Sequence, residues 1–370
     1  MPDELPELTE ILSLHLASGI GWRLYQKLET AFGSARAVLN APAARLESIP
    51  GIGPARSEAI VAQRDMAMAR EEIARARDEN IQLLHYYHPD YPLLLQQTAD
   101  PPLILYVRGT LEAEDGNGLS IVGTRRCSHY GREQARKFAL ALGQQGLTVV
   151  SGMARGIDTA AHQGGLDGGG RTLAVLGSGL LQIYPPENEE LAAAIAAHGA
   201  VVSEFPLGMP AAADHFPRRN RIIAWLTRAS LIVEGDERSG AMITARFANE
   251  EGRTVLALPG RTDTPLARGP HALIRDGATL VRDVEDILEV LATPYLPTPG
   301  AVARQRLRRE QESMERAPAN QQPRLLPDSP GPLEQHSTQP SHTSHPVHPA
   351  RQAAPTAAPT PPPPGPAGRT

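Results

Sequence analysis

The chain has 370 residues, enough for two domains and a tail, and its formal net charge at pH 7 is −5. Its only lysines are Lys27 and Lys137, so nearly every positive charge is an arginine, which can bind a phosphate through two parallel hydrogen bonds. The single cysteine, Cys127, excludes an internal disulfide, and no apolar run approaches the roughly 20 residues of a membrane span. No signal-peptide pattern opens the chain, so we expect a cytoplasmic protein without a membrane partner.

Residues 1–79 are helix-forming and almost free of β-branched runs, which predicts a small all-α domain. The segment Leu46–Arg56 resembles a helix-hairpin-helix, in which a glycine turn presents backbone N–H groups to a DNA phosphate. A weaker copy, Ser18–Arg23, suggests a tandem helix-hairpin-helix or SAM-like arrangement. Residues 1–80 carry 9 basic and 12 acidic groups, a net −3 that disfavours strong DNA binding. A protein-interaction or packing role and a DNA contact both stay open.

Residues 80–295 alternate short apolar runs with helix-length segments. Continuous apolar runs are typical of parallel strands that are covered on both faces, and the alternation predicts right-handed crossovers. We therefore expect an α/β, Rossmann-like, doubly wound, mostly parallel sheet, whose ligand site lies outside the carboxyl ends of its strands. The predicted strands are 119–123, 147–151, 171–177, 200–204, 229–234, 254–259 and 278–281.

Two glycine turns follow the first two predicted strands, at residues 123–131 and 151–158. Glycine lets a ligand approach backbone N–H groups, and the following helix N-terminus adds partial positive charge. Each turn taken alone is better explained as a tight strand-to-helix connection. The arginines at their tips, Arg125, Arg126 and Arg155, favour a phosphate site.

The segment His215–Arg221 places three arginines and an asparagine beside Phe216. This combination offers phosphate contacts, an amide and a ring on which a base can stack, as nucleic-acid-binding proteins do. A solvated arginine helix with Phe216 in the core is the alternative. A further small-residue turn, 239–244, opens another predicted helix.

Standard catalytic signatures are absent from the sequence: there is no P-loop, G-x-G-x-x-G after the first strand, G-x-S-x-G, C-x-x-C or H-E-x-x-H. Cys127 has no evident base nearby in the sequence. Asp158 and His162 lie on one helical face, where capping or packing explains them more simply than acid–base catalysis.

Beyond Thr293 the chain holds 18 of the 35 prolines and few large apolar residues. Such a composition cannot bury enough surface to offset the entropy of ordering. We expect residues 296–370 to form a disordered Pro-rich tail, whose eight arginines against five acids permit at most a weak anion contact.

The ordered set of turns resembles the DNA-processing protein A (DprA/Smf) family. The resemblance rests on five segments in order over about 150 residues: 122–131, 151–162, 216–221, 239–245 and 259–260. It implies a Rossmann-like domain that binds single-stranded DNA, forms homodimers and loads the RecA recombinase onto incoming DNA in natural transformation. The family is not known as enzymes, and the resemblance implies no cofactor.

Carried over by position, the first turn would hold phosphate, Phe216 would stack a base, and Arg219 and Arg221 would pair with the backbone of the DNA. Two departures are evident: Gly269-Pro270-His271 stands where the family usually has an asparagine, and the Pro-rich tail replaces a winged-helix module. The predicted nucleic-acid-binding set is Gly123, Thr124, Arg125, Arg126, Ser128, Ser151, Gly152, Arg155, Gly156, Phe216, Arg218, Arg219, Asn220, Arg221, Ser239 and Gly240.

The alternative hypothesis is a Rossmann-type nucleotide-binding enzyme, similar to the cytokinin-activating phosphoribohydrolases. That family has a P-G-G-x-G-T-x-x-E motif. Here Pro259-Gly260 continues as Arg-Thr-Asp-Thr, without the third glycine or the aligned glutamate, which weighs against hydrolysis.

Overall fold

Six helices precede the sheet in the computed structural model, which describes residues 4–17 and 19–292. The predicted all-α segment is thereby confirmed. The predicted tail, residues 296–370, and Ser18 lie outside the described residues. The helices are α1 Glu4–Leu16, α2 Trp22–Phe32, α3 Ala35–Asn40, α4 Ala43–Glu47, α5 Pro54–Ala62 and α6 Ala67–Asp78.

The predicted hairpin lies between α4 and α5. Gly51 has a φ of +103°, which favours glycine, and Gly53 caps α5 with Pro54 at the first helical position. The weaker copy lies between α1 and α2, where Gly19 has a φ of +80° and Gly21 caps α2. The guanidinium of Arg56 donates to the carbonyl oxygen of Gly51 at 2.6 Å. Two similar glycine turns therefore lie in the all-α segment.

The sheet has nine strands in the order β1-β2-β6-β5-β4-β3-β7-β8-β9. Strands β3 to β9 pair in parallel, which confirms the predicted doubly wound α/β fold, and each of the seven predicted strands is present. Strands β1 and β2 pair antiparallel at one edge and are absent from the predicted set. The bounds are β1 Ile81–His85, β2 Ile104–Gly109, β3 Leu119–Val122, β4 Val149–Ser151, β5 Thr172–Val175, β6 Ala200–Ser203, β7 Ala229–Ile232, β8 Thr254–Ala257 and β9 Thr279–Leu280.

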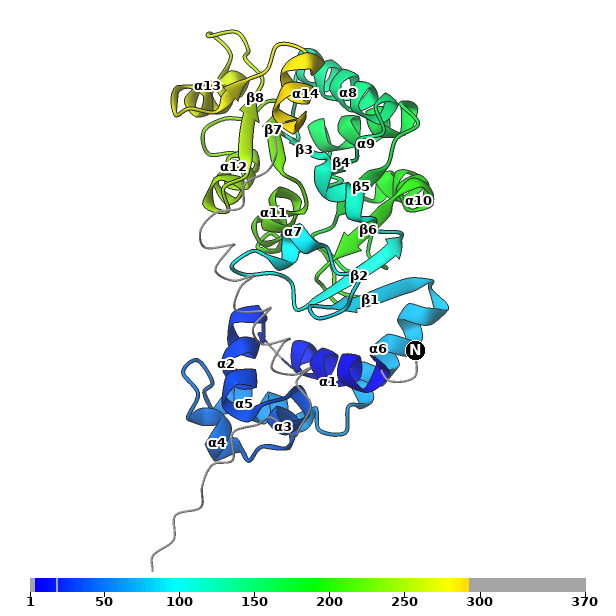
Figure 1. The fold of residues 1–370 in the computed structure, drawn as a ribbon, viewed down its shortest axis with the longest axis vertical. Helices are drawn as coiled ribbons and strands as arrows, with labels where there is room; N and C mark the ends of the chain where they lie inside the picture. Colours follow the sequence, from blue (N-terminus) through cyan, green and yellow to red (C-terminus); the bar gives the residue numbers. More distant parts are fainter. Residues whose placement is uncertain (1–3, 18, 293–370) are drawn as a thin grey trace, which may run out of the picture. The chain divides into compact units, whose positions relative to one another are not determined.

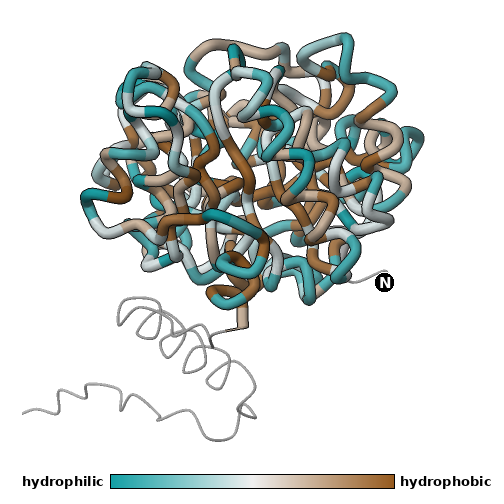
Figure 2. The backbone as a smooth tube through the Cα atoms, turned by 90° about the horizontal axis from the view of Figure 1, so that it is seen from above, coloured by the Kyte–Doolittle hydropathy of each residue, from teal (hydrophilic) through white to brown (hydrophobic). Residues whose placement is uncertain are grey.

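Helices cover both faces of the sheet (Figure 1). One core packs α11 and α12 against one face, and another packs α8, α9 and α14 against the other. Hydrophobic segments run through the middle of this layered arrangement, and hydrophilic ones gather at the outside (Figure 2). The helices are α7 Leu93–Gln96, α8 His129–Gln144, α9 Ile157–Asp167, α10 Glu189–His198, α11 His215–Leu226, α12 Gly240–Glu250, α13 Arg268–Arg275 and α14 Val284–Ala292, with short 3₁₀ helices at Ala113–Asn117, Pro186–Asn188 and Pro265–Ala267.

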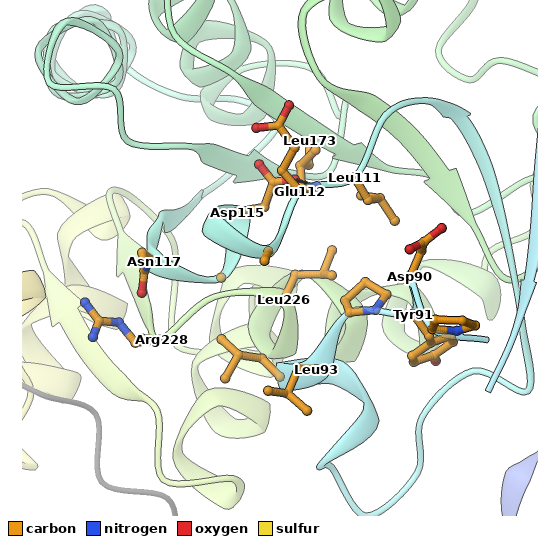
Figure 3. A pocket seen from close by; sticks show the side chains of 15 residues that line it. Asp90, Tyr91, Leu93, Leu111, Glu112, Asp115, Asn117, Leu173, Leu226 and Arg228 are labelled. Atoms are coloured by element: carbon orange, nitrogen blue, oxygen red, sulfur yellow. Dashed lines mark hydrogen bonds between the residues drawn. The ribbon is translucent and has the colours of Figure 1, made fainter. Parts of the chain in front are cut away.

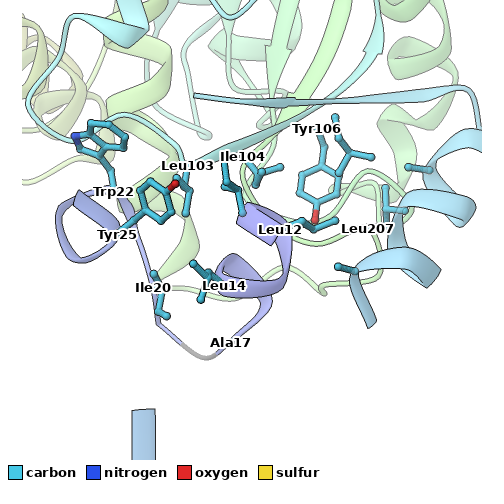
Figure 4. Packing of buried hydrophobic residues seen from close by; sticks show 14 of the residues in the cluster. Leu12, Leu14, Ala17, Ile20, Trp22, Tyr25, Leu103, Ile104, Tyr106 and Leu207 are labelled. Atoms are coloured by element: carbon cyan, nitrogen blue, oxygen red, sulfur yellow. The ribbon is translucent and has the colours of Figure 1, made fainter. Parts of the chain in front are cut away.

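A third core joins the N-terminal helices to the antiparallel edge of the sheet. Leu12 and Leu14 of α1 pack in one cluster with Ile104 and Tyr106 of β2 (Figure 4). Apolar packing therefore continues across residue 79, where the sequence predicts a boundary between two domains. That boundary stays a prediction.

Among the described helices, none combines the length and the apolar character needed to cross a bilayer.

We expect the N-terminal helices and the sheet to unfold in one cooperative transition, because they share this core. Leu14→Ala removes a fully buried side chain from it and should lower the free energy of unfolding by about 2 to 5 kcal/mol. The variants Trp225→Phe and Trp22→Phe each leave one tryptophan, in α2 and in α11 respectively, as a fluorescence probe for urea unfolding. Both probes should report one midpoint and shift together; separate midpoints would contradict the shared core.

Candidate nucleic-acid interface

A groove of about 560 Å³ lies at the carboxyl ends of the parallel strands. The turn after β3 forms one wall, and the first turns of α11 and α12 form the other. This is the edge at which doubly wound sheets bind their ligands. It is called the main groove below, and it is lined by Val122, Gly123, Thr124, Arg125, Arg126, Ala154, Asp158, Ala213, Phe216, Pro217, Arg219, Asn220, Ile223, Ser239, Gly240, Ala241, Ile243 and Thr244.

The structure brings most of the predicted set to this edge. Gly123, Thr124, Arg125, Arg126, Phe216, Arg219, Asn220, Ser239 and Gly240 line the main groove. Gly152 and Arg155 border a small recess on the other side of Phe216. Ser128, Ser151, Gly156, Arg218 and Arg221 line neither.

Arg125 and Phe216 form the mouth of the main groove. The Arg125 guanidinium carbon lies 4.5 Å from the centroid of the Phe216 ring, a cation–π contact. Arg125 and Arg126 are exposed, and no carboxylate of the described residues forms an ion pair with either. Two exposed cations therefore border a half-buried aromatic ring, and neither cation pairs with a carboxylate of the described residues.

Arg219 lies in the floor of the main groove with 3% of its surface exposed. Its Nη1 donates to the carbonyl oxygens of Gly152, which follows β4, and of Val175, the last residue of β5. Its Nε has no partner among the described residues. Burial lowers the pKa of Arg219 to about 10, although nearby Asp158 raises it. Its donors thus hold the two strand ends together, and the predicted contact with a DNA phosphate stays a prediction.

Asp158 is buried beside Arg219 at the start of α9. Burial raises its pKa to about 6, against the lowering effects of Arg219 and of hydrogen bonds from the backbones of Ala154, Gly123 and Gly152. The second glycine turn therefore directs N–H groups toward a carboxylate of the chain. These donors precede α9, so packing between the two glycine turns, and not capping of the helix, accounts for the contacts of Asp158.

Glu234 occupies the N-terminus of α8, where Ser128 was expected to bind phosphate. Its carboxylate accepts from the backbone N–H of Ser128 at 2.8 Å and from the Ser128 hydroxyl at 2.5 Å. A Cβ at Gly131 would approach this carboxylate to 2.3 Å, so the glycine makes room for it. Ser128 also caps α8, because its hydroxyl accepts from the N–H of Gly131.

Ser151 and Gly156 pack the two glycine turns together beneath the surface. The buried Ser151 hydroxyl donates to the carbonyl oxygen of Ile121 at 2.6 Å and so joins β4 to β3. Gly156 has a φ of +82°, and a Cβ there would lie 2.5 Å from the carbonyl oxygen of Thr124. Both residues therefore shape the turns from below.

The N-terminus of α12 has no acidic residue in its first turn, whereas α9 has Asp158 there and Glu234 binds at the N-terminus of α8. Ser239 is its N-cap residue and makes no capping hydrogen bond, and both Ser239 and Gly240 line the main groove. Asn220 donates to the carbonyl oxygen of Gly240 at 3.0 Å and positions this turn. Free N–H groups at a helix N-terminus attract an anion.

Arg218 and Arg221 lie on another face of α11, because residues three apart project from the same side of a helix. Both donate to Glu204, at 2.9 Å and 2.5 Å, and Arg221 is buried. Arg219 therefore lines the main groove, whereas Arg218 and Arg221 bind Glu204 on another face of α11.

Tyr184 is an aromatic residue that the sequence analysis missed. Its ring centroid lies 5.8 Å from that of Phe216, and 38% of the residue is exposed. Arg155 lies 5.9 Å from the centroid of the Tyr184 ring and forms an ion pair with Glu187. The sequence signal that could have revealed Tyr184 is an aromatic residue in the loop that follows the predicted strand 171–177.

A hollow of about 410 Å³ lies at the opposite edge of the sheet. Leu93, Leu111 and Leu226 surround it (Figure 3). Asn117 and Arg228, which also line it, lie within two residues of the starts of β3 and β7. None of the predicted residues lines it. It therefore lies at the amino ends of the strands, away from the turns that bear the unpaired arginines.

His162 gives the site region a pH dependence. It is fully buried, its Nδ1 lies 2.7 Å from the Thr172 hydroxyl, and burial lowers its pKa to about 3. In the unfolded chain His162 binds a proton near pH 6.5, whereas the buried residue of the native state does not. The free energy of unfolding therefore decreases as pH falls below 6.5.

We expect His162→Leu to reduce the loss of unfolding free energy between pH 7.5 and pH 5.0 by about 2 kcal/mol relative to the wild type. Urea unfolding at the two pH values measures this difference, and comparing the pH dependence removes the constant cost of the lost hydrogen bond. An unchanged pH dependence would show that His162 takes up its proton in the native state.

Comparison of the chain with known proteins identifies its family. The family model for DNA recombination-mediator protein A matches residues 82–292. Protein Smf from Synechocystis is 40% identical over 283 residues, which cover 75% of this chain and 71% of that protein. The X-ray structure of DNA processing protein A from Streptococcus pneumoniae matches with a TM-score of 0.68 and 32% identity, over 78% of this chain and 99% of that one.

A second structure, DNA processing protein A from Helicobacter pylori, is described for its single-stranded DNA binding mode. It matches with a TM-score of 0.52 and 27% identity, over 57% of this chain and 95% of that one. The family model spans more than half of the chain, and it ends where the described residues end, at Ala292. The resemblance found in the sequence is confirmed: the chain belongs to the DNA recombination-mediator protein A family.

Proposed function

We propose that this protein binds single-stranded DNA in the main groove and acts as a recombination mediator. The observation that carries the proposal is the pair at the groove mouth, where Arg125 lies over Phe216 with no carboxylate partner among the described residues. A cation beside an aromatic face suits a polymer of alternating phosphates and unpaired bases. The structure described for the Helicobacter pylori relative supports this choice of ligand.

The two kinds of contact lie on different elements. Arg125, Arg126 and the N-terminus of α12 at Ser239 provide the positive charge for phosphates. Phe216, with Tyr184 beside it, provides faces for bases. In a duplex the bases stack on one another, so an aromatic platform selects single strands.

A binding role suits this site better than a nucleotide-processing one. In dinucleotide-binding proteins the pyrophosphate lies at the helix N-terminus after the first strand. Here Glu234 occupies the equivalent N-terminus of α8, and its charge repels an anion. We accordingly propose no catalytic residue.

The finer role follows the family resemblance: a homodimer that loads RecA on incoming DNA in natural transformation, in the cytoplasm. No described surface is assigned to either contact. Light scattering at micromolar concentration tests the dimer, and co-precipitation with purified RecA tests the partner.

Arg125→Ala should weaken binding of single strands of any sequence and reduce the slope of log affinity against log salt by roughly 0.7, because one phosphate contact is lost. Phe216→Ala should cost about 1 to 3 kcal/mol of stacking with little change in slope. Fluorescence titration of labelled oligonucleotides at several salt concentrations measures both effects.

Arg282→Ala is the matched control, since Arg282 is exposed, pairs with Asp286 and lies outside the main groove. It removes the same charge and should leave affinity and slope unchanged. Folded Arg125 and Phe216 variants with wild-type binding would show that DNA binds elsewhere. Product analysis with nucleoside monophosphates separately tests the hydrolase alternative.

A further inference from the structure

A second groove, of about 550 Å³, lies on the other polar face of α11. It is called the junction groove here, because the turn between α1 and α2 forms one wall and segments 100–103 and 204–209 of the sheet region form the other. Phe216, Arg219 and Asn220 of α11 line the main groove. His215, Arg218 and Arg221 of the same helix line the junction groove.

Glu204 is the buried polar group of the junction groove, with 2% of its surface exposed. Its Oε2 accepts from Arg218 and Arg221. Its Oε1 is buried and has no hydrogen-bond partner among the described residues, and the same holds for Nδ1 of His15, whose ring contacts the backbone of Glu204. An unsatisfied buried acceptor destabilises the protein, so a ligand that brings an N–H donor to Glu204 would recover this energy.

The junction groove also has flat faces and a helix N-terminus. His215 stacks on Phe205 with ring centroids 4.2 Å apart, and the Arg218 guanidinium lies 5.2 Å from the Phe205 centroid. Trp22 begins α2, whose cap Gly21 offers no side-chain oxygen and whose first turn has no acid. Flat rings, a guanidinium and free N–H groups suit a nucleotide.

The two grooves are separated by one stretch of chain, the loop that leads into α11. Within that stretch Met209 lines the junction groove and Ala213 lines the main groove. The neighbours His215 and Phe216 then face the two grooves in turn. A strand stacked on Phe216 therefore has only the first turn of α11 to cross.

We propose that a DNA strand leaving the main groove at Phe216 crosses the first turn of α11 and places a further nucleotide in the junction groove. There Glu204 Oε1 accepts an N–H from the base, which each of the four bases carries, and Arg218 with the N-terminus of α2 faces the phosphate. This inference rests on the proposed function and extends it, because it makes the N-terminal helices part of the binding surface.

Oligothymidylates of increasing length test the proposal on the full chain. We expect dT4 to occupy the main groove alone and dT10 to reach both grooves. A longer strand also binds in more registers, which lowers the dissociation constant by a calculable factor. Beyond that factor, the dissociation constant for dT10 should be about tenfold lower than that for dT4. Met209→Glu places a negative charge in the junction groove and should abolish this extra gain. Met68→Glu, a control at an exposed methionine of α6, should retain it.

Trp22 provides a second measurement that needs no charge change. In the Trp225→Phe variant, dT10 should quench Trp22 fluorescence and dT4 should not, because Trp22 lines the junction groove. A retained length gain in Met209→Glu, an equal loss at both lengths, or absence of quenching by dT10 would overturn the junction site. Failure of the wild type to bind dT4 and dT10 alike would instead refute the proposed function.

Discussion

The main groove depends on one buried guanidinium, that of Arg219. By donating to the carbonyl oxygens of Gly152 and Val175, it fixes the ends of β4 and β5 relative to α11. The approach is so close that a Cβ at Gly152 would lie 1.9 Å from Arg219 Nη1, which explains the glycine that follows β4. The charge of nearby Asp158 favours the protonated guanidinium, so these two buried groups stabilise the floor of the main groove.

Internal carboxylates then determine where an anion can bind. Glu234 accepts from the N-terminus of α8, and Asp158 accepts from the turn before α9, so both N–H sets are already neutralised. The N-terminus of α12 has no such acid and opens into the main groove beside the unpaired Arg125 and Arg126. The groove thus combines unpaired positive charge with an aromatic ring, an arrangement that matches a nucleic-acid strand better than a compact dinucleotide.

The sequence was sufficient to predict the seven parallel strands and the edge that carries the site, because buried parallel strands are continuous apolar runs and their turns are glycine-rich. It was insufficient to separate the arginines of α11, whose directions depend on the rotation of that helix against the sheet. The contact of Ser128 with Glu234 joins residues 106 positions apart, which no local pattern reveals. Strands β1 and β2 were missed because antiparallel edge strands stand outside the strand–helix alternation.

The structure of the full chain bound to dT6 tests the central claim most directly. The account predicts a phosphate at the N-terminus of α12 near Ser239 and Gly240, a second phosphate at Arg125, and a base stacked on Phe216, with Glu234 still bound to Ser128. A phosphate that displaces Glu234 at the N-terminus of α8, or a strand that avoids Phe216, would contradict it.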